Sequence, residues 1–220
     1  MQRPIRTTLS PTADDPNGIA LTQTPGAGGN LTLAGVLISG GVATFATPQH
    51  VTVSSNGIDT TRVFTVTGTN REGVALTDTI TGVNATTITG DENFATVTQI
   101  AVDDATAGAI TAGVDGTCDG RWLQLDQRTP DPTVTAQIGL GGGTMTYTVQ
   151  STLDSVFASD FDEIAATAID HSVAVGDSAD QIVQYAPGGT DPAPVAAIRL
   201  QITAHTSGAA TFNLFPVRGF

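Results

Sequence analysis

The amino-acid sequence predicts an all-β protein, built as an extended N-terminal arm followed by two β-sandwich modules. Short apolar runs alternate with turns rich in Gly, Asn and Asp along most of the chain, which is typical of a sandwich. Hydrophobic residues make up 40% of the 220 residues, enough to form a core. Threonine recurs at alternate positions, and its β-branched side chain suits a half-buried pleated surface.

The predicted arm covers residues 1–30. Prolines interrupt it at positions 4, 11, 16 and 25, and a glycine-rich joint ends it at residues 26–29. Such a segment cannot bury enough apolar surface to fold by itself. Two interpretations stay open: an arm that lies along a neighbouring molecule, and a flexible terminus.

The first sandwich module is expected over residues 31–117. Its clearest hairpin runs from Arg62 to Thr81, with a turn at residues 70–73. Strand ends with outward threonines are each followed by a glycine that permits a turn. Asp78 interrupts the apolar face of the hairpin, and it marks either a bulge or a strand end near solvent.

A linker is expected over residues 118–132. Its single Cys118 excludes an intramolecular disulfide and is predicted to be a small buried or half-buried side chain. Trp122, the only tryptophan, is expected to seal the junction between the modules or to cap the second core, because so large an aromatic is rarely left in water.

The second sandwich module is expected over residues 133–220. Apolar and polar residues alternate from Val134 to Leu140, and a glycine run then turns the chain into a second alternating strand that begins at Met145. A similar pair of strands is expected near the C-terminus on either side of a turn at 205–208. One short helix is expected at Asp160–Ala168, with Asp160 as its N-cap.

The charge of the chain is strongly negative. Twenty-one acidic residues face 8 basic ones, all of them arginine, for a net charge of −13. This field disfavours nucleic acid and anionic membrane surfaces as partners. No apolar run approaches the roughly 18 residues of a membrane helix, and no signal segment is recognised. The protein is therefore expected to reach an extracellular setting as part of a particle.

The residues needed for catalysis do not form a recognisable pattern. His50, His171 and His205 fit no nucleophile or metalloprotease motif and are predicted to lie at the surface or in turns. We therefore predict no enzymatic activity, no cofactor and no metal. A structural calcium ion is a minor alternative, with the pairs Asp115/Asp119 and Asp160/Asp162 as the places to look.

Several stretches resemble uncharacterised structural proteins of tailed bacteriophages. They are strand signatures without a catalytic motif, cover about half of the chain, and lie at residues 39–44, 50–53, 64–70, 76–82, 145–154 and 194–203. The resemblance implies that the first module is immunoglobulin-like and the second jelly-roll-like. It also implies a place on the capsid or tail of a virion, and it carries over no functional residue.

The function expected from these observations is that of a capsid decoration or cement protein on the exterior of a virion. It would bind the major capsid protein, copies of itself as a homo-oligomer such as a trimer, or both. Arg3, Arg6 and Trp122 are the candidate docking residues. The alternatives are a tail or fibre component that binds a host glycan or adapts other tail proteins and, least favoured, a β-sandwich hydrolase.

Overall fold

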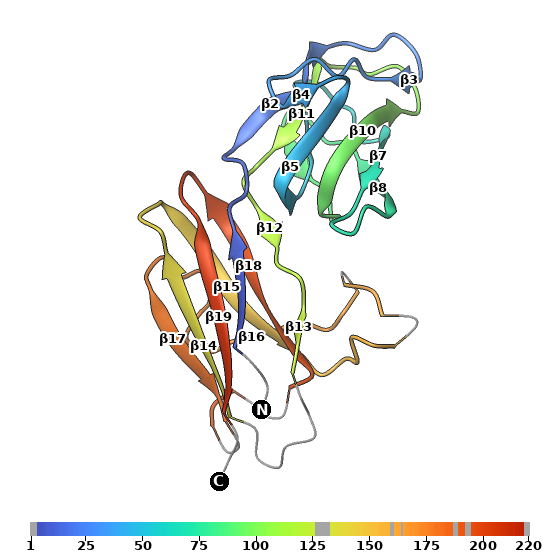
Figure 1. The fold of residues 1–220 in the computed structure, drawn as a ribbon. Helices are drawn as coiled ribbons and strands as arrows, with labels where there is room; N and C mark the ends of the chain where they lie inside the picture. The colour runs from blue at the N-terminus through green and yellow to red at the C-terminus, as the bar shows by residue number, and fades with distance from the viewer. Residues whose placement is uncertain are drawn as a thin grey trace. The chain divides into compact units, whose positions relative to one another are not determined.

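The computed structural model describes residues 4–125, 133–158, 161–163, 165–186, 189–191 and 195–217 (Figure 1). The described residues form nineteen β-strands and no helix, which confirms the predicted all-β class. The chain divides into two compact units. The N-terminal unit is Pro11–Cys118, and the C-terminal unit combines the residues up to Ser10 with those from Asp119 onward. The N-terminal unit is therefore an insertion within the sequence of the C-terminal unit.

The N-terminal unit is built from two sheets. Its strands are β2 (Asp15–Gln23), β3 (Gly29–Asn30), β4 (Ile38–Ser39), β5 (Val42–Gln49), β6 (Thr52–Ser55), β7 (Val63–Thr69), β8 (Ala75–Thr81), β9 (Thr87–Thr89), β10 (Phe94–Val102) and β11 (Ile110–Val114). One sheet has the order β2-β11-β6-β9, and the other has the order β4-β5-β10-β7-β8 with β3 also paired to β10. The strand pairings are antiparallel.

The core of the N-terminal unit consists of the apolar side chains of both sheets. Phe64 and Val66 of β7 are fully buried, as are Ile19 of β2 and Ile110 of β11, and Val53 of β6 is almost so. Along β7 and β8, buried side chains alternate with more exposed ones, as a half-buried strand requires. Burying a side chain of this size stabilises a fold by about 1.5–3 kcal/mol.

The predicted hairpin between Arg62 and Thr81 is confirmed as β7 and β8. Its turn is held by Asn70, whose side-chain oxygen accepts the amides of Glu72 at 3.0 Å and Val74 at 2.9 Å. Gly73 has φ of 77°, a left-handed conformation that other residues rarely adopt. Asn70 therefore supplies a side-chain acceptor for the turn amides, and Gly73 supplies the positive φ that the turn requires.

Asp78 is neither a bulge nor a strand end. It lies in the middle of β8, in unbroken register opposite Val66, and its side chain is 8% exposed. Its carboxylate accepts the amide of Thr79 at 2.7 Å and that of Glu92 at 3.3 Å. The charge is tolerated on the inner face because two backbone amides satisfy it, one from β8 itself and one from the loop before β10.

A second buried carboxylate, Asp59, ties together two loops of the N-terminal unit. It is 1% exposed and accepts the Ser55 hydroxyl at 2.5 Å and the amides of Ala107 at 2.6 Å and Gly108 at 3.2 Å. Burial acts to raise the pKa of this carboxyl, but its hydrogen bonds and the charge of Arg62 hold the pKa below its usual value. Asp59 is therefore ionised in the folded protein at neutral pH.

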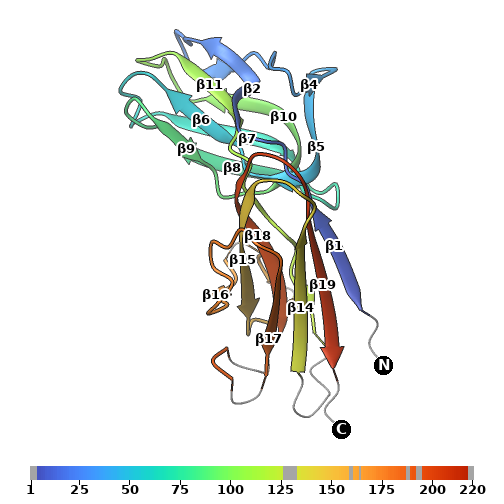
Figure 2. The ribbon, with the colours of Figure 1, turned by 90° about the vertical axis from the view of Figure 1, so that its left-hand side faces the viewer.

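The C-terminal unit is also built from two antiparallel sheets. Its strands are β1 (Ile5–Leu9), β12 (Cys118–Asp119), β13 (Leu123–Gln124), β14 (Thr133–Leu140), β15 (Met145–Thr152), β16 (Ile169–Asp170), β17 (Gln181–Tyr185), β18 (Ala197–His205) and β19 (Ala210–Val217). One sheet has the order β1-β19-β14-β17, whose strands lie side by side in Figure 2, and the other has the order β12-β18-β15-β16 with β13 also paired to β18.

Strand pairing in the C-terminal unit is nested. If the two-residue β13 is set aside, eight strands remain, and β1 pairs with the last of them, β12 with β18, β14 with β17, and β15 with β16. The chain thus runs out along four strands and returns along the other four, like one long hairpin wound into two layers. The inner faces of the layers supply the core, with buried side chains that include Ile138, Tyr147, Leu200, Ile202 and Phe212.

The expected connections in the second module are wrong, although its strands are confirmed. The glycine run after Leu140 and the turn after His205 were expected to join hairpins. Instead, β14 and β15 lie in different sheets, as do β18 and β19. Alternation with period two identifies a strand, but backbone partners far away in the sequence decide which sheet it joins.

The expected N-terminal arm is also wrong. Ile5–Leu9 is a strand of the C-terminal unit, where Ile5 pairs with Leu214 and Leu9 with Ala210. Asp15–Gln23 is a strand of the N-terminal unit and supplies buried side chains to its core. Both strands lie at sheet edges, where proline is tolerated because one side of the backbone needs no ladder partner.

The expected linker over residues 118–132 is wrong as far as the structure describes it. Cys118 is fully buried, as predicted, and β12 and β13 join the sheet of the C-terminal unit through β18. Leu123 and Leu125 are buried there. Residues 126–132 lie outside the described residues.

The expected helix at residues 160–168 is not formed by the residues that are described there. The Ala166 amide donates to the Asp162 carbonyl at 3.0 Å, and the Ala165 amide donates to the Asp162 side chain at 3.2 Å. This is one capped turn, with Asp162 in the role expected of Asp160. Asp160 and Ile164 lie outside the described residues.

The first testable prediction concerns β1. Deleting residues 1–10 removes an edge strand from the C-terminal unit and exposes the edge of β19, so we expect that unit to lose stability. The N-terminal unit, which lies wholly within Pro11–Cys118, is expected to keep its own unfolding transition. Hydrogen exchange of the β19 amides measures the first effect and that of the β10 amides the second. Equal loss of protection in both strands would contradict the division into units.

The second prediction concerns Asp59. Because its pKa is lower in the folded than in the unfolded state, it stabilises the fold above the unfolded pKa of about 3.9, and this contribution is lost as pH falls through the folded pKa. Asp59→Asn is expected to cost about 1–3 kcal/mol at pH 7, since loop amides lose a charged acceptor. Urea unfolding between pH 2 and 7 measures both effects, with the exposed Asp91→Asn as the matched control.

Candidate functional site: a docking surface on the C-terminal unit

An arginine is buried on the outer face of one sheet of the C-terminal unit. Arg199 lies on β18 between the inward-facing Ile198 and Leu200, so its own side chain points away from the core. It lies opposite Gln150 of β15. Its exposure is nevertheless only 7%, because the segments after β12 and β15 cover this face.

The partners of Arg199 satisfy its charge and its hydrogen-bonding groups. Its Nη1 lies 3.2 Å from the carboxylate of Asp119, and its Nε donates to Gln150 at 2.8 Å. Nη1 also lies 3.4 Å from the Glu163 carbonyl. Burial lowers the pKa of the guanidinium, and the nearby negative charges, Asp119 foremost, oppose that shift. The result is a buried, paired cation that holds three separate segments together.

Trp122 is buried by the same cluster. The guanidinium carbon of Arg199 lies 4.5 Å from the centre of the indole ring, in the range of a cation–π interaction. The indole nitrogen donates to the Glu163 carbonyl at 3.2 Å. Trp122 is 7% exposed and therefore packs within the C-terminal unit. As a candidate docking residue it forms the wall of a site, and it offers little surface for direct contact.

A hollow of about 530 Å³ opens beside Trp122. Apolar, polar and charged side chains line it together: Ile5, Arg121, Trp122, Leu123, Gln124, Val156, Phe157, Phe161 and Glu163. Phe157 is 75% exposed, and Leu153, close by in sequence, is 62% exposed. Exposed aromatic and aliphatic side chains on one loop mark a surface suited to binding another molecule. We call this surface the Phe157 hollow.

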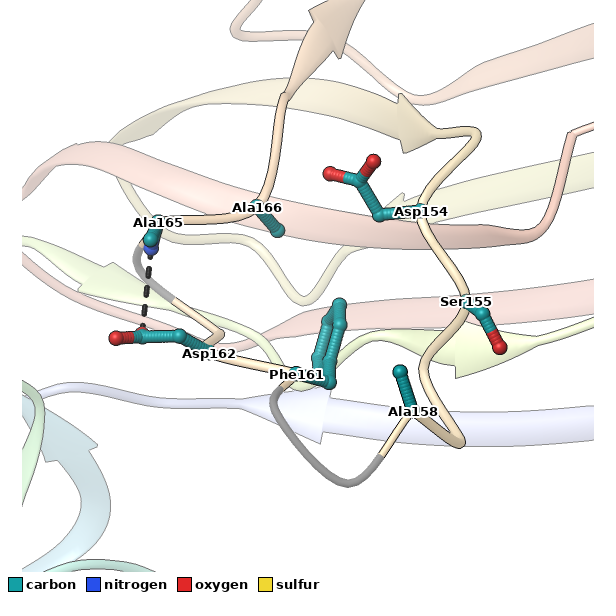
Figure 3. Close-up of a pocket in the computed structure, with 7 residues that line it drawn as sticks. All are labelled: Asp154, Ser155, Ala158, Phe161, Asp162, Ala165 and Ala166. Carbon is teal, nitrogen blue, oxygen red and sulfur yellow. Dashed lines mark hydrogen bonds between the residues drawn. The ribbon is translucent and has the colours of Figure 1, made fainter.

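A second, smaller hollow of about 270 Å³ shares Phe161 with the first (Figure 3). Asp154 and Asp162 lie on its rim, but both have structural partners. Asp154 accepts the Thr167 amide at 2.7 Å, and Asp162 caps the turn described above. Both hollows are thus lined in part by the segment after β15, and the Glu163 carbonyl of that segment contacts Trp122 and Arg199.

The predicted docking residues do not come together. Arg3 lies outside the described residues. Arg6 is exposed on β1, opposite Asn213. Its neighbour Ile5 lines the Phe157 hollow, and because successive strand residues face opposite sides, Arg6 points away from it. The structure thus separates Arg6 from Trp122 and adds Phe157, which sequence reasoning missed. The available signal was two phenylalanines in the irregular stretch of a chain that is only 5% aromatic.

The histidines are more buried than expected. His171 is 3% exposed and His205 8%, while His50 is half-buried. The predicted surface position is therefore wrong for His171 and His205, whereas the alternative of a turn holds for His171, whose carbonyl accepts the Ala174 amide at 3.2 Å. Both ring nitrogens of His171 have partners, Nε2 at the Gln184 carbonyl (3.3 Å) and Nδ1 at the Val173 amide (3.3 Å), whereas His205 uses only Nε2, which contacts the Gly208 carbonyl at 3.1 Å.

His171, Ser172 and Asp191 include the residue types of a catalytic triad, but in a different order. Asp191 accepts the Ser172 hydroxyl at 2.7 Å and lies 3.2 Å from the His171 ring. A triad requires the imidazole between hydroxyl and carboxylate. Among the described residues, no hydrogen bond joins Ser172 to His171. Asp191 also accepts the Ser172 amide at 2.8 Å, so the carboxylate pins this turn.

The acidic pairs proposed for calcium have other roles. Asp115 accepts the hydroxyls of Thr117 at 2.6 Å and Thr89 at 2.7 Å. Asp119 pairs with Arg199 and accepts Gln201 at 2.8 Å. Within the described residues, no group of three or more His, Cys, Asp or Glu side chains is placed to hold a metal ion.

The third prediction concerns the Arg199 cluster. Arg199→Met leaves Asp119 buried without its cation, and removing one member of a buried ion pair costs about 3–5 kcal/mol. We expect the fluorescence emission of Trp122, the only tryptophan, to shift to longer wavelength. We also expect the unfolding midpoint followed by this emission to fall. Arg6→Met, which removes the same charge from an exposed site, is the control and should change stability by less than about 0.5 kcal/mol. Adding Asp119→Leu to Arg199→Met should recover part of the loss, and no recovery would show that the charge pair is not its cause.

No family model, curated protein or solved structure matches this chain. Among the described residues there is also no helix with the length and apolar character needed to cross a membrane. Functional inference therefore rests on the topology, the charge and the surface chemistry described above.

Proposed function

We propose that this chain is a non-enzymatic structural protein of a tailed-bacteriophage virion, which decorates the capsid exterior and stabilises the head by binding the major capsid protein. The observation that carries this proposal is the nested strand order of the C-terminal unit, in which β1-β19-β14-β17 faces β12-β18-β15-β16. A hairpin wound into two four-stranded sheets is the plan of a jelly roll, a fold shared by viral capsid and lectin domains. This support is an analogy at the level of fold.

The N-terminal unit enters the proposal as an immunoglobulin-like module. Its two antiparallel sheets and common apolar core support a sandwich of this general kind. The chain has a single cysteine, so neither sandwich is stabilised by an intramolecular disulfide. This suits a protein that is further stabilised by contacts with other subunits of an assembly. The insertion of one unit into the other also gives the chain two connections between them, one at each end of the inserted unit.

Docking on the capsid is assigned to the C-terminal unit. Within the segment expected to be an arm, Ile5–Leu9 and Asp15–Gln23 are strands of the two units, so we assign the contact to a folded surface. The Phe157 hollow offers an exposed aromatic beside the apolar side chains of Ile5 and Val156, with the exposed Arg121 also on its lining. Buried aromatic anchors carry much of the energy of protein interfaces. Arg6 remains a second candidate, as an exposed cation on an acidic chain.

Absence of enzymatic activity is supported by the side-chain geometry. Two clusters of a hydroxyl, an imidazole and a carboxylate occur among the described residues, and neither has the imidazole in the centre: Asp191 is central in one and Thr117 in the other. The net charge of −13 without any lysine supports partners other than nucleic acid and anionic membranes.

The second candidate function is a tail or fibre component that binds a host glycan, or an adaptor between tail proteins. The same jelly-roll order favours it, because lectin domains share that fold. The position of the tryptophan disfavours it: Trp122 is buried, whereas a sugar platform needs an exposed aromatic face. Phe157 is the aromatic that such a site would have to use.

The fourth prediction tests the proposed function. Quantitative mass spectrometry of purified particles should give a ratio of this chain to the major capsid protein close to one or to a simple fraction of one. A ratio of a few per cent would favour the tail, and absence from particles would overturn the virion assignment. In particles, Phe157→Asp is expected to lower the incorporated amount, because it places a charge in an apolar contact.

Val173→Asp is the matched control for that variant. Val173 is 62% exposed in the same unit and does not line the Phe157 hollow. The Val173→Asp variant should be incorporated into particles in the same amount as the wild-type protein. Equal loss in both variants would contradict docking through the hollow while leaving the copy-number result intact.

A further inference from the structure

One outer sheet face of the N-terminal unit carries no charged side chain. Strands β8, β7, β10 and β5 lie side by side (Figure 1), and their registers place outward residues in rows across the sheet. One row joins Thr77, Thr67 and Gln99, and another includes Thr69, Thr96 and Thr44. We call this surface the threonine face; its members are Thr44, Val63, Thr65, Thr67, Thr69, Ala75, Thr77, Thr79, Thr81, Thr96, Gln99 and Ala101.

The side chains of the threonine face are exposed or half-buried. The outward residues of β8 are exposed, and those of the more central β7 are half-buried, while Phe64, Val66 and Ile80 between them point into the core. The hydroxyls of Thr69 and Thr96 lie 2.7 Å apart, so neighbouring strands are linked on this side as well. The face is thus a regular array of methyl and hydroxyl groups on a sheet.

The neutrality of this face contrasts with the rest of the chain, which has a net charge of −13. Charges gather beyond its ends, as where Arg62 approaches Asp104 at 3.3 Å and Asp103 at 3.8 Å. Two copies of so acidic a chain repel each other, and the repulsion is least where neither presents a charge. Each threonine hydroxyl both donates and accepts, so an identical face offers matching hydrogen-bond partners.

We propose that the threonine face is a homotypic contact, through which two copies of this chain associate face to face about a two-fold axis. Its strands of seven residues, β7 and β8, span about 20 Å, and four strands span roughly 15–20 Å, or about 350 Å² per copy. Two copies would bury about 700 Å², less than the roughly 1,200 Å² of a stable interface. The contact is therefore weak in dilute solution and strengthened wherever copies are held close together.

The response to salt distinguishes this contact from one based on ion pairs. The force opposing association is repulsion between like charges, and at physiological ionic strength such forces are screened beyond about 8 Å. Adding salt therefore strengthens the association. A contact made by ion pairs would weaken instead. This inference concerns the isolated protein and does not depend on the proposed place in a virion.

The test is sedimentation velocity of the full chain over a range of concentrations at low and high salt. The wild-type protein is expected to dimerise reversibly, and the dimer fraction should increase with protein concentration and with salt concentration. Thr79→Lys places an unpaired charge on the face, at an exposed position of the edge strand β8, while reducing the net charge to −12 from −13. We expect its association constant to fall by at least about tenfold, because the added charge cannot be paired in the contact.

Thr22→Lys is the matched control. Thr22 is also an exposed threonine on an edge strand, β2, but in the other sheet of the same unit. It makes the same change in net charge and should associate at least as well as wild type. Thr79→Asp should weaken association as Thr79→Lys does, since either sign is unpaired in a contact between identical faces. Circular dichroism verifies that each variant is folded.

Three outcomes would overturn the proposal: a monomeric wild type at every concentration and salt, equal loss in Thr22→Lys and Thr79→Lys, or association that survives Thr79→Asp but not Thr79→Lys. The last would indicate a cationic partner surface. Because the measurement uses purified protein, its failure is separate from any failure to find the chain in particles.

Discussion

The antiparallel pairing of β1 with β19 is the constraint on which the architecture depends. It joins Ile5 to Leu214, almost the two ends of the described chain, and the whole N-terminal unit lies in the sequence between the first strand and the rest of its own sheet. Closing so long a loop is entropically costly, although the cost grows only slowly with length. The nested pairings of the remaining strands supply the compensating contacts, so the C-terminal unit depends on its first and last strands together.

A buried charged side chain positions loops in each of the two units. Asp59 in the N-terminal unit and Arg199 in the C-terminal unit are each buried and each bonded to groups from several segments. A buried charge is costly unless its partners are in place, so such groups define one arrangement of the loops around them. In the C-terminal unit this arrangement carries the Phe157 hollow, because the carbonyl of Glu163 is held by both Trp122 and Arg199.

The surfaces of the two units have different chemistry. The C-terminal unit presents an aromatic and aliphatic hollow, and the N-terminal unit presents a neutral face of threonines. An acidic, lysine-free chain meets less electrostatic repulsion at a surface that lacks charge, and the threonine face is such a surface. Under the two proposals, the Phe157 hollow contacts a different molecule and the threonine face contacts a second copy of the chain.

The sequence by itself determined the all-β class, the β7–β8 hairpin and the strands β14, β15, β18 and β19, because alternation and turn chemistry are local properties. It did not determine that Ile5–Leu9 and Asp15–Gln23 are edge strands, since proline is equally compatible with an arm, nor that β14 and β15 belong to different sheets. Only the tertiary structure placed Trp122 under Arg199 and buried His171, because burial depends on which distant segments cover a side chain. Pairing and coverage are non-local, and a single sequence contains no direct record of them.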